Sequence, residues 1–440
     1  MSATALTTPD STTLDRTFVL PQVDVSVSKW SFVFIWLFTI AIYARPEDML
    51  PSLGLLHLTF VFGLCAGLTY LLALALAGPR LLRSRELGIV VVLTIWYIAG
   101  IPFALWRSGS LYTLLHVWLK TLFVFFLLTQ TLVTLHRVRR LLWAIILSEL
   151  VITSISIVQP SKVIWVGERM LGVNQGILGW NFLGIAAAVT IPYIAAIFLA
   201  RQSLLQKSLL IAAFGCMMWM LMLTASRGGI LSVLFSVTLT WLLILRRSSY
   251  GRILGTGIVL GLTLVISLAP AVFWQRLSTV WDDPEMSANR VEASAEESKQ
   301  DHLFALTQSV QYTLDNPIFG LGLGNFDVAS GMELGRWMGT HNTFTQVSSE
   351  AGLPALLLFI SLPITALLRL KRIKHAFSGE SAELFLMINA TMASLLAFAF
   401  GACFAHLAYE YYFFYPLAIA VALQHIGKRI SASPLTHTGS

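Results

Sequence analysis

Apolar runs close to twenty residues long recur from Trp30 almost to the C-terminus, and they constrain this chain more than any other feature. A helix of about 20 apolar residues spans the hydrocarbon core of a bilayer and satisfies its own backbone hydrogen bonds. Of the 440 residues, 56% are hydrophobic and only 12% are charged. A soluble domain carries roughly twice that charged fraction. The chain is therefore predicted to be an all-α polytopic membrane protein.

The polar breaks between these runs predict about twelve transmembrane helices. Their expected positions are 30–44, 55–77, 88–106, 111–133, 141–158, 177–199, 208–224, 229–245, 253–273, 351–369, 383–403 and 408–424. Helices 1–9 fall in 30–273 and helices 10–12 in 351–424, with one long loop at 274–350 between them. Residues 1–29, rich in Ser, Thr and Asp, are predicted to be a disordered tail, and 425–440 a second tail.

The distribution of basic residues predicts the orientation of these helices. Most Lys and Arg residues lie in the tails and in short loops on the side of the termini, for example at 137–140, 246–252 and 369–374. Lys and Arg near the ends of spans favour the cytoplasmic side. Both termini are therefore predicted to be cytoplasmic, and 274–350 to face outward. Because the basic residues cluster between spans, the net charge of +7 needs no nucleic-acid partner to explain it.

The long outer segment contains a helical pattern. Its first part is polar and acidic, and Leu303, Leu306, Val310 and Leu314 then recur at spacings of three and four residues. This spacing is typical of an amphipathic helix, which would end before Pro317. Two charged residues, by contrast, lie inside the predicted spans. Lys120 and Glu149 occupy consecutive antiparallel helices, and the structural interpretation is a buried ion pair between them.

Ionisable residues also gather at the predicted outer ends of the spans. They are Arg227, Arg276, Arg290, His341, Glu350, His406 and Glu410. The short connection "TASRGGI" holds Arg227 at the membrane surface, in a tight turn that Gly228 and Gly229 would permit. A guanidinium binds phosphate bidentately, and a histidine transfers protons near neutral pH. These groups predict a site for an anionic lipid head group with proton transfer.

Four short motifs in this order resemble the O-antigen ligase and polymerase superfamily. They are "ILGWNFLGIAAAVTIP", "SRGG", "DNPIFGLGLGNF" and "THNTFTQVSSEAGLPALLLFI", within roughly 170–370. The resemblance implies a glycosyltransferase of lipopolysaccharide or exopolysaccharide biosynthesis in the bacterial inner membrane. Its donor would be a glycan on undecaprenyl diphosphate at the periplasmic side. Its acceptor would be the lipid A core (a ligase) or a growing glycan (a polymerase), and the motifs do not decide between them.

The resemblance also implies roles for individual residues, and it implies neither a cofactor nor a metal. Arg227 would bind the diphosphate, together with Arg290 or its competitor Arg276. His341 would act as general base toward the acceptor hydroxyl, or orient it, and displacement at the anomeric carbon would invert its configuration. The acidic run 292–297 departs from the common pattern, since it could pair with Arg290. Candidates for acceptor contacts or for support of the site are Asn181, Asn342, Glu350, His406 and Glu410.

Other interpretations compete with these roles. His341 would also suit a helix cap, and Arg227 an interfacial residue whose charge reaches toward water. "GLGLGN" fits a nucleotide-binding loop only superficially, because it follows a helix and Asn-Pro rather than a strand. The alternative function is a transporter of a small anion or a lipid-linked glycan. Transporters favour polar sites at mid-membrane and inverted repeats, whereas the candidate groups here gather at one face.

Overall fold

The computed structural model describes residues 29–77, 81–159, 163–166, 169–173, 180–200, 202–248, 251–278, 290–376 and 382–432. The predicted N-terminal tail, apart from Lys29, lies outside these residues, as does the end of the predicted C-terminal tail. Within the described ranges a helix lies at each predicted span. These helices are α1 (Lys29–Ala44), α3 (Leu58–Ala77), α4 (Arg85–Gly100), α5 (Arg107–Thr113) continuing through η3 (Leu114–Trp118) into α6 (Leu119–Thr131), α7 (Leu135–Val158), α8 (Trp180–Leu199), α9 (Leu204–Thr224), α10 (Arg227–Leu243), α11 (Gly251–Ser267), α15 (Thr343–Ala376), α16 (Ala382–Gly401) and α17 (Tyr411–Ala432).

The predicted all-α polytopic membrane fold is confirmed. Among the described residues, 8 helices are long and apolar enough to cross a membrane, and α1 and α10 are shorter apolar helices. The figure of twelve spans stays a prediction. The elements between the long helices are α2 (Pro46–Met49), η1 (Pro51–Leu56), η2 (Ile101–Phe103), β1 (Val163–Val166), β2 (Arg169–Val173), η5 (Leu245–Arg247), α12 (Ala271–Ser278), α13 (Arg290–Asp315) and α14 (Phe326–Leu334). The sequence pattern did not predict the antiparallel β1–β2 hairpin.

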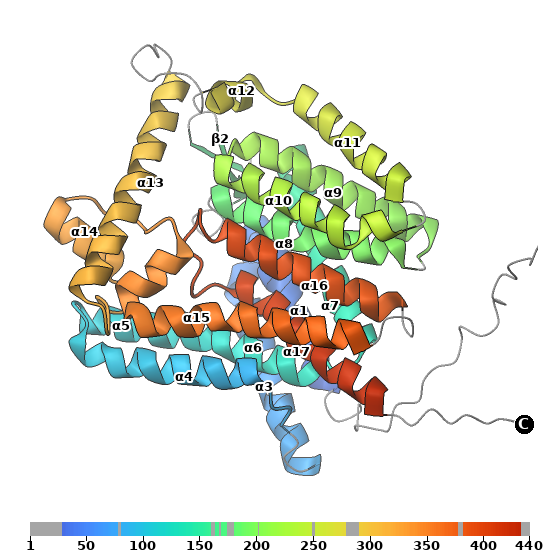
Figure 1. Cartoon of the computed structure of the whole chain (residues 1–440), viewed down its shortest axis with the longest axis horizontal. Helices are drawn as coiled ribbons and strands as arrows, with labels where there is room; N and C mark the ends of the chain where they lie inside the picture. Colours follow the sequence, from blue (N-terminus) through green and yellow to red (C-terminus); the bar gives the residue numbers. More distant parts are fainter. Residues whose placement is uncertain are drawn as a thin grey trace, which may run out of the picture.

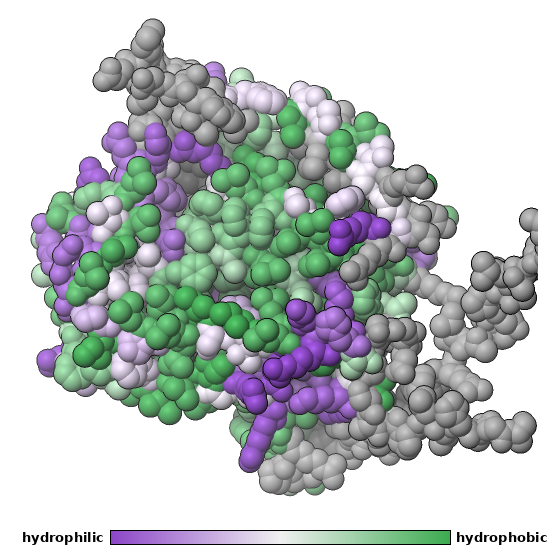
Figure 2. Space-filling model, viewed as in Figure 1, coloured by the Kyte–Doolittle hydropathy of each residue, from purple (hydrophilic) through white to green (hydrophobic). Residues whose placement is uncertain are grey.

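Most of the long helices, among them α4, α6, α15 and α16, run side by side, and α13 and α14 lie at one end of the bundle (Figure 1). We call this the outer end, because the segment that forms it is predicted to face outward. Apolar residues cover the middle of the visible face, and hydrophilic residues gather toward its two ends (Figure 2). This distribution suits a bilayer around the middle of the bundle.

Close helix packing in the centre of the bundle depends on small residues. α8 packs against α10 and α16, and Gly184 lies so close to Gly229 that a Cβ on Gly184 would overlap the Gly229 backbone. Small residues let two membrane helices approach in this way. The packing fixes the position of the first turn of α10, which begins at Arg227.

α15 begins before the predicted span and bends where that span was expected to start. The helix starts at Thr343, and Gly352 interrupts it with φ 82° and ψ 173°, a conformation that strongly favours glycine. The outer part of α15 is fixed to the "GLGLGN" loop, since Leu321 N and Gly322 N donate to the carbonyls of Ser349 and Glu350 at 2.8 and 2.9 Å. The loop is therefore part of the scaffold.

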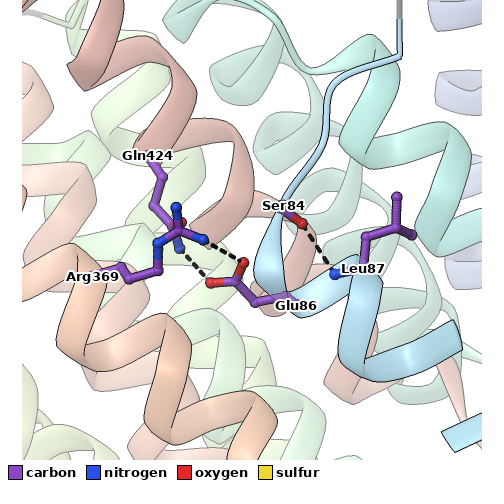
Figure 3. Close-up of polar contacts among 5 residues, drawn as sticks. All are labelled: Ser84, Glu86, Leu87, Arg369 and Gln424. Carbon is purple, nitrogen blue, oxygen red and sulfur yellow. Dashed lines mark hydrogen bonds and ion pairs between the residues drawn. The ribbon is translucent and has the colours of Figure 1, made fainter. Parts of the chain in front are cut away.

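A buried polar cluster joins three helices at the opposite, inner end. Arg369 of α15 lies 3.2 Å from Glu86 Oε2, and Gln424 of α17 donates to Glu86 Oε1 at 2.8 Å (Figure 3). Glu86 belongs to the first turn of α4, which Ser84 caps by accepting from Leu87 N at 3.0 Å. The cluster ties α4, α15 and α17 together, since all the carboxylate oxygens of Glu86 have partners.

The predicted ion pair between Lys120 and Glu149 is wrong. Thr190 of α8 donates a hydrogen bond to Glu149 Oε1 at 3.1 Å. Glu149 is buried, whereas the Lys120 side chain is exposed on another side of the helix pair, where it faces a cavity. Spacing along two helices does not determine which way each residue faces.

Candidate functional site

Arg227 lies at the start of α10, where α9 turns directly into the next helix. Ala225, with φ 46°, ends α9, and Ser226 caps α10 by accepting from Gly229 N at 3.1 Å. The tight turn expected from "TASRGGI" is present, but Ala225 and Ser226 make it. Gly229 serves instead the close contact with α8. The Arg227 side chain is partly buried at the positive end of the α10 dipole.

His341 occupies a strained position immediately before α15. Its φ is 53°, in the left-handed region that costs a non-glycine residue about 1–3 kcal/mol. Asn342 is the residue that caps α15, because its Oδ1 accepts from Phe344 N at 2.9 Å and Thr345 N at 3.1 Å. The capping interpretation thus belongs to Asn342. The partly buried imidazole of His341 is left for other contacts.

Three imidazoles meet at this point. His302 of α13 stacks on His341 with ring centroids 4.3 Å apart and planes 28° apart. His406, in the connection between α16 and α17, meets His341 edge to face at 5.7 Å. Gly339 makes room for His406, since a Cβ there would lie 2.8 Å from the His406 ring. We call His302, His341 and His406 the histidine cluster.

Arg227 belongs to the same region of the molecule as the histidine cluster. Burial, the neighbouring His341 and the charge of Arg227 lower the pKa of His302 to about 4. Burial and His341 likewise lower the pKa of His406 to about 4. Burial also lowers the pKa of His341, against an opposing effect of Asp301. All three imidazoles are therefore neutral at pH 7, the form in which a histidine accepts a proton.

The structure describes only the backbone at two of the predicted phosphate ligands. Arg276 lies in α12 and Arg290 is the first residue of α13, but their side chains are outside the part that the structure describes. Arg290 is about 18 Å along α13 from His302 at the helical rise of 1.5 Å per residue. The choice between Arg276 and Arg290 stays open. The Asn181 side chain also lies outside the described part.

Two predicted supporting residues lie apart from the histidine cluster. Glu350 is buried, and its Oε2 accepts from Tyr409 Oη at 2.6 Å and from Gly324 N at 2.9 Å. It therefore holds the "GLGLGN" loop and the connection before α17 in place. Glu410 faces a cavity beside α1, α3 and α6. His406 is the predicted supporting residue that contacts His341 directly.

His302 was not among the residues predicted for the site. The spacing of Leu303, Leu306, Val310 and Leu314 predicted an amphipathic helix, and the helix is present as α13. These four side chains are exposed, however, with Leu303 at 57% and Leu314 at 67%. The face that packs on the protein carries Ala305, Ser309, Tyr312 and Thr313. His302 precedes Ala305 and Ser309 by three and seven residues, and this spacing was the available signal.

In this arrangement, the guanidinium of Arg227 could bind an anion while the neutral imidazole of His341 accepts a proton. Among the described residues, no group of three His, Cys, Asp or Glu side chains is arranged to hold a metal ion. Residues 212–360 match the family model described as O-Antigen ligase, a stretch that includes Arg227, His302 and His341. No curated protein matches the chain. The chain is thus a multi-pass membrane protein in which residues 212–360 are similar to the O-antigen ligase family.

Proposed function

We propose that the protein moves a glycan from undecaprenyl diphosphate to a sugar hydroxyl at the periplasmic face of the bacterial inner membrane. The observation that carries this proposal is that the histidine cluster lies at one end of an apolar helix bundle, near enough to Arg227 for its charge to lower the pKa of His302. The acceptor is the lipid A core or the end of a growing polysaccharide. Both termini of the chain lie in the cytoplasm, as the distribution of basic residues predicts.

Arg227 binds the donor diphosphate. A guanidinium forms two parallel hydrogen bonds to phosphate oxygens and stays charged at any physiological pH. The start of α10 reinforces this attraction, because the first backbone N–H groups and the dipole of a helix both favour an anion. Arg290 or Arg276 supplies a second guanidinium. An isoprenoid tail can remain in the bilayer while its head group lies at the depth of Arg227.

His341 accepts the proton of the acceptor hydroxyl. The hydroxyl oxygen attacks the anomeric carbon while the bond from that carbon to the diphosphate oxygen breaks, and the electron pair of that bond leaves with the diphosphate. Attack from the face opposite the leaving group inverts the anomeric configuration. The proton then passes from the His341 imidazolium to water. His302 stacks on the His341 ring and His406 meets it edge to face, so the two together fix its orientation.

The proposal requires no metal or nucleotide. The leaving group is already activated as a diphosphate, and arginine side chains offset the charge that it carries away. A base with a lowered pKa remains unprotonated at neutral pH, so it needs no metal-bound hydroxide to take the proton.

Reconstitution of the purified protein in liposomes tests the proposal. The liposomes contain an undecaprenyl-diphosphate-linked glycan with either lipid A core or an unlinked glycan acceptor, with and without a chelator. The expected product is the glycan joined to one acceptor class, formed equally with chelator present. If the intact donor instead moves between leaflets and no new glycosidic bond forms, the protein is a transporter.

A further inference from the structure

A second site lies away from the histidine cluster. A cavity of about 710 Å³ opens between α1, α3, the α5–α6 helix and the start of α17. This volume is in the usual range for small-molecule sites. Much of its wall is apolar, formed by Phe38, Ile42, Phe60, Leu64, Leu115 and Phe123. Such a wall suits a hydrocarbon chain.

Lys120 introduces a positive charge into this apolar wall. Within the described residues, its ammonium has no hydrogen-bond or ion-pair partner. An ammonium inside a membrane span is costly and usually functional. The π-helical turn Leu114–Trp118 comes directly before Lys120. Such turns are rare and often occur at functional sites, since they shift the direction of the side chains that follow.

Glu410 places a negative charge on another part of the same wall. Its side chain also has no hydrogen-bond or ion-pair partner among the described residues. Thr121 donates to the Tyr409 carbonyl at 2.8 Å, so the neighbours of Lys120 and Glu410 are in direct contact. Arg45 and Glu47 add one more charge of each sign to the lining.

We propose that this cavity binds a zwitterionic phospholipid whose head group carries a phosphate and a primary ammonium, as phosphatidylethanolamine does. Its phosphate binds Lys120, its ammonium binds Glu410, and one acyl chain lies along the apolar wall. The balance of charges favours this ligand, because a purely anionic head group would lie against two carboxylates. The site is independent of the glycan transfer proposed at His341.

Native mass spectrometry tests this assignment. The full-length protein is mixed in detergent with equal amounts of phosphatidylethanolamine and phosphatidylglycerol, and the lipids that stay bound after the detergent is removed are measured. The wild type is expected to retain phosphatidylethanolamine preferentially. Lys120→Met should lower retention of both lipids about tenfold, the effect of losing one charge-assisted hydrogen bond. Glu410→Gln should remove the preference between the lipids while leaving phosphatidylglycerol bound. Lys207→Met, at an exposed end of α9, is the matched control and should change neither.

The melting temperature with and without added lipid provides a second test, which can also be applied to a variant that is less stable. Adding phosphatidylethanolamine should raise the melting temperature of the wild type more than phosphatidylglycerol does, and Glu410→Gln should remove that difference. Equal retention of both lipids by the wild type would overturn the proposal. So would undiminished retention of phosphatidylethanolamine by Lys120→Met, or its displacement by an equal amount of a phosphorylated glycolipid.

Discussion

The two ends of the helix bundle each hold a polar cluster, buried at the inner end and partly buried at the outer end, and the clusters differ in how many of their polar atoms have partners. At the inner end, both carboxylate oxygens of Glu86 have partners, one in Arg369 and one in Gln424. At the outer end, the imidazoles contact one another through their rings, and the buried His406 Nδ1 has no hydrogen-bond partner among the described residues. Buried polar groups without partners are rare in folded proteins, so each one needs an explanation.

This difference suggests that the inner cluster stabilises the fold, whereas the outer cluster takes part in the proposed reaction. The inner cluster joins three helices through one ion pair and one amide hydrogen bond, and its carboxylate is fully buried. The outer cluster holds neutral imidazoles and accepts the left-handed backbone of His341. Strain of this kind persists where surrounding structure enforces it, and it concentrates at functional sites. The comparison predicts that mutations at the outer end reduce the rate, while mutations at the inner end reduce the stability.

The largest effect is expected from His341→Ala. Loss of a general base typically lowers a rate by about 10²–10⁴-fold. The melting temperature should change little, because Asn342 still caps α15. Initial rates of glycan transfer in liposomes measure the effect, with His116→Ala at an exposed position as the control. A variant with more than about a tenth of the wild-type rate would exclude His341 as the base.

Arg369→Met should have the opposite profile. It leaves Glu86, which is 0% exposed, without its cation, and breaking a buried pair in this way destabilises by about 3–5 kcal/mol. Unfolding in detergent measures the free energy, and Arg372→Met, exposed on the same helix, is the control. The transfer rate per folded molecule should equal that of the wild type. A stable variant with a slow rate would contradict the assignment of roles to the two ends.

Arg227→Lys should impair transfer while keeping the charge. Lysine cannot reproduce the two parallel hydrogen bonds of a guanidinium, and losing one charge-assisted hydrogen bond of about 1.5–3 kcal/mol corresponds to roughly a ten- to hundredfold fall in kcat/KM. Arg107→Lys, at an exposed position near the same end, controls for a general effect of the exchange. Wild-type kinetics in Arg227→Lys would rule out bidentate binding of the diphosphate.

Much of the architecture was predictable from the sequence, because each helix that crosses a membrane needs a long run of apolar residues. The apolar runs identified the helices, and the turn before Arg227 followed from a connection too short for a loop. The start of α15 was less predictable. Its first residues, Thr343 to Ala351, are largely polar, and tertiary hydrogen bonds to the "GLGLGN" loop hold them in place.

Pairwise contacts were less predictable than the helices. The outward direction of Lys120 follows a π-helical turn that hydropathy does not reveal. His302 lies on a face of small and aromatic residues, whereas its helix showed a stronger pattern of leucines that turned out to be exposed. Glu86 binds Arg369 and Gln424, which are more than 280 residues away in the sequence, so the hydropathy pattern does not reveal this contact.

The smallest expected effect concerns the charge beside the histidine cluster. Asp301 raises the pKa of His341 against the effect of burial, and it lies 3.6 Å from Arg336 in a partly exposed pair. Asp301→Asn removes this charge and should lower the pKa of His341 further. Because the neutral imidazole is the active form, the acid limb of the rate profile should move to lower pH. The shift should stay below about one pH unit, since solvent and salt screen partly exposed charges.

The salt dependence of this shift distinguishes an electrostatic effect from a structural one. The difference between the acid limbs of the wild type and Asp301→Asn should shrink as ionic strength rises. Asp315→Asn, at an exposed position near the far end of α13, should leave the profile unchanged. A shift of the acid limb to higher pH would mean that the proton acceptor titrating in this range is not His341. The unpaired Nδ1 of His406 would then be a consequence of packing alone. The difference between the two ends of the bundle would no longer indicate a catalytic role for the outer cluster.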